Sequence, residues 1–466
     1  MRTGDQIVQD LPWKWNVQGK IFLIGGLGYL FDAWDIALNG FLTPLVALDF
    51  DLSTGARGYV ATANLVGMAV GAIVWGSIAD RLGRKRAFSI TLAIFALFSV
   101  LGAFSPNYEV FLAFRFIAGF GLGGCIPVDY AIVGEFSPKR VRGKVLTALD
   151  LFWPIGATLA GLSAWALLGV DHNWRVMLGI MVLPALLTFW VRRGVPESPI
   201  YLAKVGREAE AREVIDRLVR ATGATPEDYE IKPPVVEAKV NGFVAAARQL
   251  RMIWGRMPMI TLTAWMLFVS IMVVYYAALS WLPTLLSDAG ASFTVAFLGS
   301  TIMSAIGIFG CALSTYLVDI TGRKWLLGVS ASLGSVALVG IGATLEMTGL
   351  ALIAIGVFGF VIQMAIPVLY AYIAEMYPTE VRASGFAWSS SASRVATGLT
   401  PLLFSAWMFP VLGKVTTFLV LMVLVFISVA MMVKFAPETK GMDLDAVTDD
   451  RDVDAAPTSA PAAAFE

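Results

Sequence analysis

The stretch IFLIGGLGYLFDAWDIALNGFLTPLVAL, residues 21–48, is long and apolar enough to cross a lipid bilayer, which takes about 20 residues of a helix. Two carboxylates, Asp32 and Asp35, lie near its middle. A charge at mid-membrane costs at least ~2.5 kcal/mol, and residues three apart share one face of a helix. We therefore expect this face to look into a protein interior or a water-filled cavity and to hold a proton or substrate site. Two acids that snorkel to the interface from a helix end are the alternative.

The composition of the whole chain indicates a helical membrane protein that crosses the bilayer many times. Of its 466 residues, 58% are hydrophobic and 15% are charged, and the net charge is zero, which leaves no basic surplus for nucleic acid. Cys125 and Cys311 lie in apolar runs and are expected to pack, and His172 is the only histidine. We find no nucleophile–base set, nucleotide loop or metal cluster, so we expect neither an enzyme nor a bound cofactor or metal.

Hydropathy predicts an all-α membrane protein with twelve spans in two groups of six. Residues 1–192 are predicted to form an N-terminal bundle, 193–257 a linker with short surface helices, 258–440 a C-terminal bundle and 441–466 a disordered tail. The spans are predicted near residues 21–48, 57–79, 86–104, 108–135, 145–168, 174–192, 258–287, 294–318, 324–344, 348–375, 382–409 and 411–435.

The loop charges set the expected orientation. The second-to-third and fourth-to-fifth loops are rich in arginine and lysine, whereas the third-to-fourth loop has neither. By the positive-inside rule, the two basic loops and both termini lie in the cytoplasm. The N-terminus has no cleavable signal pattern, so the first span is expected to direct its own insertion into the cell (plasma or inner) membrane.

Three motifs of the first half return in the second half at offsets of 239, 240 and 241 residues. This regularity indicates a six-helix unit duplicated head to tail, with a transport site between parallel halves that rock in alternating access. The motif pairs are Asp80-x-x-Gly83-Arg84-Lys85 with Asp319-x-x-Gly322-Arg323-Lys324, Glu135-x-x-Pro138-x-x-Val141-Arg142 with Glu375-x-x-Pro378-x-x-Val381-Arg382, and Pro196-Glu197-Ser198 with Pro437-Glu438-Thr439.

These motifs resemble those of the major facilitator superfamily. Residues 76–85, GSIADRLGRK, look like its signature loop between helices two and three. The run Arg115-x-x-x-Gly119-x-Gly121-x-Gly123, together with the Glu135, Pro196 and Pro437 motifs, resembles the sugar-porter branch. The resemblance covers residues 21–441 and implies twelve transmembrane helices in two pseudo-symmetric bundles.

Within this branch the chain departs from hexose carriers. Helix seven of those carriers holds paired glutamines that bind sugar hydroxyls, and alignment on residues 275–276 places Trp265 and Met266 there. Residues 275–283, YYAALSWLP, and residues 31–35 look more like the niacin, synaptic-vesicle-protein and organic-ion carriers. This similarity favours an organic acid over a sugar as the substrate.

Arg115 is the expected partner of Asp35. In related proton-coupled sugar carriers, an aspartate on helix one and an arginine on helix four form a protonation switch, and these two residues match those positions. When Asp35 takes a proton, its attraction for the guanidinium is lost and Arg115 is free to move. A static structural ion pair is the alternative. Asp32 is expected to be a second proton site or a ligand for a cationic substrate.

Arg394 lies near the middle of the predicted eleventh span. A guanidinium offers fork geometry to a carboxylate, so we expect it to receive an anionic group of the substrate; pairing with an intramembrane acid such as Asp32 is the alternative. An aromatic cavity with few polar groups would suit a flat aromatic acid better than a polyol. The other candidate lining residues, each of which could instead serve in packing, are Trp34, Trp153, Tyr275, Tyr276, Gln363 and Trp388.

The resemblance also implies a latch that closes the cytoplasmic side. Acids and bases alternate at fixed spacing near the cytoplasmic helix ends, so opening would break several ion pairs together. We expect Asp129 and Asp150 to form structural or gating pairs with loop arginines. The glycines of the 119–123 run are expected to permit close helix packing. The predicted latch residues are Asp80, Arg84, Glu135, Arg142, Asp319, Arg323, Glu375 and Arg382.

Together these features predict a monomeric secondary active transporter, with protons and a small organic metabolite, carboxylate or aromatic, as its partners in the lipid bilayer. Proton-coupled symport by alternating access is the expected mechanism. A sugar or polyol symporter and an organic-ion or drug exporter are the alternatives of the same class. A non-transporting receptor is a further alternative, although receptors usually carry a larger cytoplasmic signalling tail.

Overall fold

The computed structural model describes residues 2–183, 186, 195–231, 242–378 and 381–440. Ten helices in this part are long and apolar enough to cross a membrane, in keeping with a fold of twelve spans. The predicted tail lies outside the described residues. The side chains of a few residues within the ranges are also not described, and three of these were assigned roles above: Asp80, Arg84 and Asp129.

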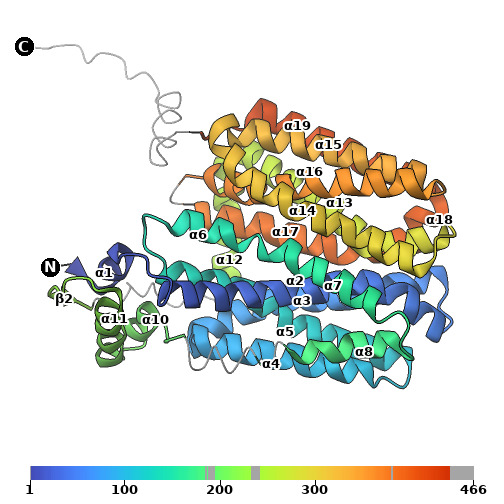
Figure 1. The fold of residues 1–466 in the computed structure, drawn as a ribbon. Helices are drawn as coiled ribbons and strands as arrows, with labels where there is room; N and C mark the ends of the chain where they lie inside the picture. Colours follow the sequence, from blue (N-terminus) through green and yellow to red (C-terminus); the bar gives the residue numbers. More distant parts are fainter. Residues whose placement is uncertain (1, 184–185, 187–194, 232–241, 379–380, 441–466) are drawn as a thin grey trace, which may run out of the picture.

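The membrane helices lie side by side in two groups, with the N-terminal group below the C-terminal group in Figure 1. The N-terminal half contains α2 (Gln18–Asp49), α3 (Thr54–Leu82), α4 (Arg84–Ala103), α5 (Tyr108–Phe136), α6 (Arg142–Leu149), α7 (Phe152–Ala166) and α8 (Asn173–Gly179), which a 3-10 turn extends over Ile180–Val182. The C-terminal half contains α13 (Pro258–Asp288), α14 (Phe293–Thr321), α15 (Arg323–Thr344), α16 (Thr348–Glu375), α17 (Arg382–Leu403), a π-helix over Phe404–Met408, α18 (Phe409–Leu412) and α19 (Lys414–Phe435).

Local sequence explains where several of these helices begin. The side chains of Ser53, Asn107 and Ser292 each accept a hydrogen bond from the backbone N–H three residues further on. This is the usual cap of a helix N-terminus, because it satisfies an N–H group that has no partner inside the helix. Most of the predicted spans agree with the structure within a few residues, the fifth and eleventh differ, and most of the second half of the sixth, residues 184–192, lies outside the described residues.

The fifth span is broken in the middle rather than continuous over residues 145–168. Its two helices, α6 and α7, are separated by Asp150 and Leu151. Pro154 explains the break, because a proline ring has no N–H to donate and clashes with the carbonyl four residues earlier, here that of Asp150. The carbonyl of Asp150 instead accepts a hydrogen bond from the backbone N–H of Trp153 at 3.2 Å.

The boundary between the last two spans also differs from the prediction at residues 409–411. Helical structure continues from α17 through the π-helix and α18 to Leu412. The chain turns at Gly413, which has a φ of 77°, a conformation that glycine adopts at little cost and other residues rarely adopt.

We call the end of the bundle that carries the loops at residues 81–86 and 139–144 the basic end, and the opposite end the distal end. The halves contact each other at the distal end, where α2 packs on α13, α3 on α17 and α7 on α14. A Cβ atom on Gly40 would lie only 2.4 Å from the carbonyl oxygen of Leu279 in the other half. Arg57 of α3 also pairs with Asp288 of α13 at 3.2 Å.

At the basic end a cavity separates the described parts of the two halves. This cavity has a volume of about 850 Å³, with Lys144 of α6 on one wall and residues of α14 and α16, among them Asp319 and Glu375, on the other. The structure is therefore closed at the distal end and open at the basic end.

A small unit packs on the basic end of the N-terminal half, at the left of Figure 1. It contains α1 (Gly4–Asp10), α10 (Pro199–Lys204), α11 (Glu208–Thr222) and two short strands, β1 (Arg2–Thr3) and β2 (Tyr229–Glu230), while α12 (Gly242–Arg256) leads into α13. The two strands, which the sequence analysis did not predict, pair in parallel. Ile7 and Val8 of α1 are buried with Ile215 and Leu218 of α11 in one apolar cluster, so burial holds the N-terminal segment in place.

Candidate functional site

Asp35 and Arg115 lie in a closed ring of four polar side chains inside the N-terminal half. Nη1 and Nη2 of Arg115 donate to the two carboxylate oxygens of Asp35 at 2.8 and 3.0 Å, and Nη2 also donates to Oδ1 of Asn39 at 2.7 Å. Nδ2 of Asn64 donates to Asp35 at 3.1 Å, and Nδ2 of Asn39 donates to Oδ1 of Asn64 at 3.1 Å. All four side chains are fully buried, so each charge is matched by fixed partners in place of water.

Close approach of three helices makes this ring possible. Asp35 and Asn39 lie one turn apart on α2, while Asn64 comes from α3 and Arg115 from α5. A Cβ atom on Gly119, one turn beyond Arg115, would lie 2.0 Å from the backbone oxygen of Asn64. Glycine at this position therefore lets α5 and α3 touch, as the glycine spacing predicted. The sequence analysis paired the two charges but missed both asparagines.

We expect Asn64→Leu to lower the thermal unfolding midpoint of the purified protein. The substitution removes one of the two hydrogen bonds that Oδ2 of Asp35 accepts and leaves Nδ2 of Asn39 with only its bond to the carbonyl of Ile36, at a cost of about 1–2 kcal/mol. Thr62→Val, on the same helix, is the matched control, because the Thr62 hydroxyl is buried and makes no hydrogen bond in the described part of the chain. Equal midpoints for the two variants would mean that the ring does not stabilise the bundle.

A cavity between the two halves gathers most of the predicted substrate residues. It is small, about 50 Å³, which is room for water rather than for an aromatic acid, so a substrate would have to displace side chains to enter. Five of the seven predicted residues line it: Trp153, Tyr275, Tyr276, Gln363 and Arg394. The sequence analysis missed other lining residues, which stand in no motif: Tyr29, Met68, Met272, Tyr370, Ser390, Ser393 and Thr397.

The hydroxyl of Tyr275 joins the two halves at this cavity. It accepts hydrogen bonds from Nε1 of Trp153, on α7, at 2.8 Å and from Nε2 of Gln363, on α16, at 3.1 Å. A tyrosine hydroxyl can accept two hydrogen bonds and donate one. Because both acceptor positions are used here, only the O–H donor remains free to bond another group. The tyrosine is thereby set to act as a donor toward an acceptor in the cavity.

Arg394 is the cationic residue on the cavity wall. Its side chain is half-buried, and its guanidinium makes no hydrogen bond or ion pair with any described residue. Asp32 is close enough for the charge of Arg394 to act on it, yet both of its carboxylate oxygens are buried without a hydrogen-bond partner in the described part of the chain. The two groups thus influence each other across a distance and do not form an ion pair.

The structure places three further predicted residues elsewhere than the sequence analysis expected. Trp34 stacks on Phe31 with ring centroids 6.2 Å apart, and Trp388 is half-buried against the apolar core, so the structure brings neither to the cavity. Asp150 was expected to pair with loop arginines near the helix end. The structure places it on the cavity wall, at the break between α6 and α7, and its pairing with an arginine stays a prediction.

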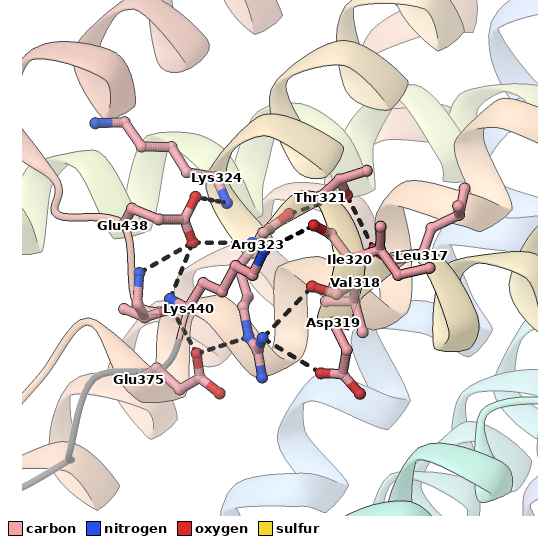
Figure 2. A network of polar contacts seen from close by, with 12 residues as sticks. Leu317, Val318, Asp319, Ile320, Thr321, Arg323, Lys324, Glu375, Glu438 and Lys440 are labelled. Carbon is pink, nitrogen blue, oxygen red and sulfur yellow. Dashed lines mark hydrogen bonds and ion pairs between the residues drawn. The ribbon is translucent and has the colours of Figure 1, made fainter.

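Charged residues of the C-terminal half gather at the basic end, as Figure 2 shows. The carboxylate oxygens of Glu438 accept hydrogen bonds from the backbone N–H groups of Arg323 and Lys324, at 3.0 and 3.1 Å, and so cap α15. The side chain of Arg323 lies between Asp319, at 3.4 Å, and Glu375, at 3.3 Å. A carboxylate is stabilised at a helix N-terminus by the free N–H groups and the helix dipole, which explains the place of Glu438.

The N-terminal half repeats this cap. Glu197 accepts a hydrogen bond from the backbone N–H of Lys85 at the start of α4, at 3.2 Å. The residues before these helices, Gly83 and Gly322, have φ angles of 96° and 91°, and a Cβ atom on either would lie under 3 Å from the capping glutamate. The repeated motifs thus build the same helix start twice, a role that the sequence analysis did not give to the two glutamates.

The described contacts of the predicted latch residues lie within one half. Arg142 donates to the backbone oxygen of Ser137 at 3.3 Å, and Arg382 to that of Tyr377 at 3.3 Å. None of the ion pairs described at the basic end joins the two halves, in line with the open cavity there. Their action as a latch stays a prediction.

Comparison with known proteins identifies the family. The sequence pattern of the family described as "Sugar (and other) transporter" matches residues 22–450. The chain belongs to this family of the major facilitator superfamily. It is 32% identical to the niacin transporter NiaP of Acinetobacter baylyi over 91% of this chain and 94% of the relative, and 31% identical to the gallate transporter of Pseudomonas putida over 82% and 83%.

The fold agrees with solved structures of the same superfamily. The xylose transporter XylE of Escherichia coli, in a partially occluded inward open conformation, superposes with a TM-score of 0.74 at 19% identity, covering 91% of this chain and 99% of that one. Because the chain belongs to a transporter family over most of its length, it is a multi-pass membrane protein and a secondary transporter with a small-molecule substrate, and it is not an enzyme.

Proposed function

We propose that this transporter carries a small aromatic carboxylate together with protons. The observation that carries the proposal is Arg394, whose half-buried guanidinium has no described partner on the wall of a cavity rich in aromatic rings. A carboxylate would supply the acceptors that the guanidinium lacks, and a flat ring would pack against tyrosine and tryptophan. Relatives named as niacin and gallate transporters support the same substrate class.

Charge balance is the proposed basis of proton coupling. When ionised, the acids Asp32 and Asp35 and the bases Arg115 and Arg394 sum to zero, and Asp150 on the cavity wall adds one negative charge in every state. A monocarboxylate bound to Arg394 adds a negative charge to an interior in which an uncompensated charge costs several kcal/mol. One proton taken up by Asp32 or Asp35 restores the balance, so the proposed cycle moves one proton with each monocarboxylate.

The proposed orientation places the basic end and both termini in the cytoplasm, because basic loops stay on that side of a membrane. In this orientation the structure is an inward-facing state. The contacts at the distal end, including the pair Arg57–Asp288, would have to break for the site to open outward, and the basic end would have to close.

A thermal-shift screen of the purified transporter tests the substrate class. We expect nicotinate, benzoate and gallate to raise the unfolding temperature, because a ligand at 100 times its Kd stabilises the folded form by about 2.7 kcal/mol. Nicotinamide and benzamide, which have the same rings without the charge, are the matched controls and should have little effect. Stabilisation by hexoses or organic cations, with none by the carboxylates, would contradict the proposal.

A further inference from the structure

A groove between α3 and α17 reaches Arg394 from the outer surface of the bundle. Its volume is about 410 Å³, larger than that of the central cavity. Small or apolar side chains form most of its walls, among them Ala69 and Ala72 of α3 and Ala387 of α17. Arg394 lines both the groove and the central cavity, so the same guanidinium is within reach from either space.

The outer side of the groove faces the bilayer. Ile73 of α3 is 71% exposed and Val395 of α17 is 56% exposed, and both line the groove. Val395 belongs to a row of exposed residues at a spacing of four along α17, which continues with Leu399 and Leu403. Apolar side chains that project together from one face of a membrane-spanning helix are in contact with lipid, so the groove opens into the hydrocarbon layer.

We propose that this groove binds a free fatty acid from the bilayer, with the carboxylate on Arg394 and the chain between α3 and α17. The guanidinium supplies the complementary charge at the inner end, and it has no described ion pair or hydrogen bond to compete for it. The apolar walls suit an aliphatic chain better than the flat polar substrates proposed for the central cavity. This goes beyond the proposed function, since it assigns a second ligand class and a second route to Arg394.

The depth of Arg394 favours a fatty acid over a phospholipid. The residue lies twelve positions after the start of α17, Arg382, which is about 18 Å along a helix and close to the middle of a hydrocarbon core about 30 Å thick. A phospholipid headgroup carries permanent charge and stays at the interface. A fatty acid can bring its carboxyl group to this depth, because it can cross the core in its protonated, neutral form and ionise beside the guanidinium.

Laurate binding to the transporter in lipid nanodiscs tests the proposal. We expect laurate to raise the unfolding temperature of the wild-type protein in a saturable manner and to displace bound benzoate. Ala387→Trp fills the groove and should weaken laurate binding by about tenfold or more, while benzoate affinity stays within about twofold. Ala72→Trp fills it from the facing helix and should act in the same way if Ala387→Trp fails to fold.

Two controls separate the groove from other causes. Leu399→Trp adds the same ring to the lipid-facing side of α17 outside the groove and should bind laurate as the wild-type protein does. Methyl laurate, which has the chain without the charge, and nanodiscs enriched in phosphatidylglycerol should neither stabilise the protein nor displace benzoate. Equal effects of laurate and methyl laurate, displacement by the anionic phospholipid, or laurate binding that both tryptophan variants leave unchanged would overturn the proposal.

The result is independent of the proposed substrate. If benzoate does not bind but laurate stabilises the wild-type protein and the groove variants do not respond, the groove assignment stands and the substrate class is wrong. If benzoate binds and laurate has no effect, the groove assignment is wrong and the substrate class stands.

Discussion

Asp35→Asn should abolish proton-driven accumulation of the substrate in proteoliposomes and leave counterflow exchange measurable. The amide keeps the shape of the carboxylate and can still accept a hydrogen bond from Arg115, but it cannot take up a proton. A pH difference of one unit is worth about 1.4 kcal/mol, or about tenfold accumulation for one proton per substrate. In the variant this ratio should fall to about one, because exchange of substrate for substrate needs no net proton movement.

Asp49→Asn is the matched control for this result. Asp49 ends the same helix at the distal end, where its side chain is 40% exposed and pairs with Arg175 at 3.5 Å, outside the proposed proton path. Its removal should leave accumulation unchanged. Asp32→Asn serves as a second comparison: loss of accumulation in that variant, with normal accumulation in Asp35→Asn, would assign the proton to Asp32. Normal accumulation in both would remove the acids of α2 from the coupling mechanism.

Arg394→Gln should weaken binding of nicotinate or benzoate by about 10- to 100-fold, since a hydrogen bond to a charged group is worth about 1.5–3 kcal/mol. Arg394→Lys keeps the charge but not the planar fork and should give an intermediate loss. Direct binding to the purified protein measures both effects without the need for a working transport cycle.

The substitution Arg394→Gln should also change which ligands the protein prefers. Without the guanidinium, the variant should no longer distinguish nicotinate from nicotinamide, because only the carboxylate depends on a positive charge. Arg57→Gln, which removes a half-buried arginine from the pair with Asp288 at the distal end, should preserve that preference. Unchanged carboxylate affinity in Arg394→Gln would take this residue out of the substrate site.

The pairing of Asp35 with Arg115 shows what patterns along a chain can predict. A carboxylate in an apolar span needs a cationic partner, and the resemblance to proton-coupled sugar carriers identified Arg115, also in an apolar span, as that partner. The asparagines that close the ring could not be found in this way. An amide in a span has many ways to satisfy its hydrogen bonds, and only the contact of α3 with α5 at Gly119 decides which one occurs.

The residues that line the cavity show the same limit of prediction from sequence. Tryptophan and tyrosine pack equally well in a core, at a lipid interface or around a ligand, so the type of residue did not separate Trp153, which reaches the cavity, from Trp34 and Trp388, which do not. The sequence analysis took the fifth span as one continuous helix and therefore placed Asp150 near its end. The structure shows Asp150 at the break before Pro154 and on the cavity wall, and the proline four residues after the acid was visible in the sequence.

The sequence by itself determined the membrane helices, the duplication of the six-helix unit and the presence of buried charges. Hydropathy and the cost of an isolated charge in lipid act along a single helix, and the motif spacing is read along the chain, so none of the three depends on a contact between helices. The tertiary structure alone decided which side chains complete the ring around Asp35, which residues reach the cavity and which end of the bundle is open. Those outcomes depend on how far apart two helices from different parts of the chain lie, and no local pattern fixes that distance.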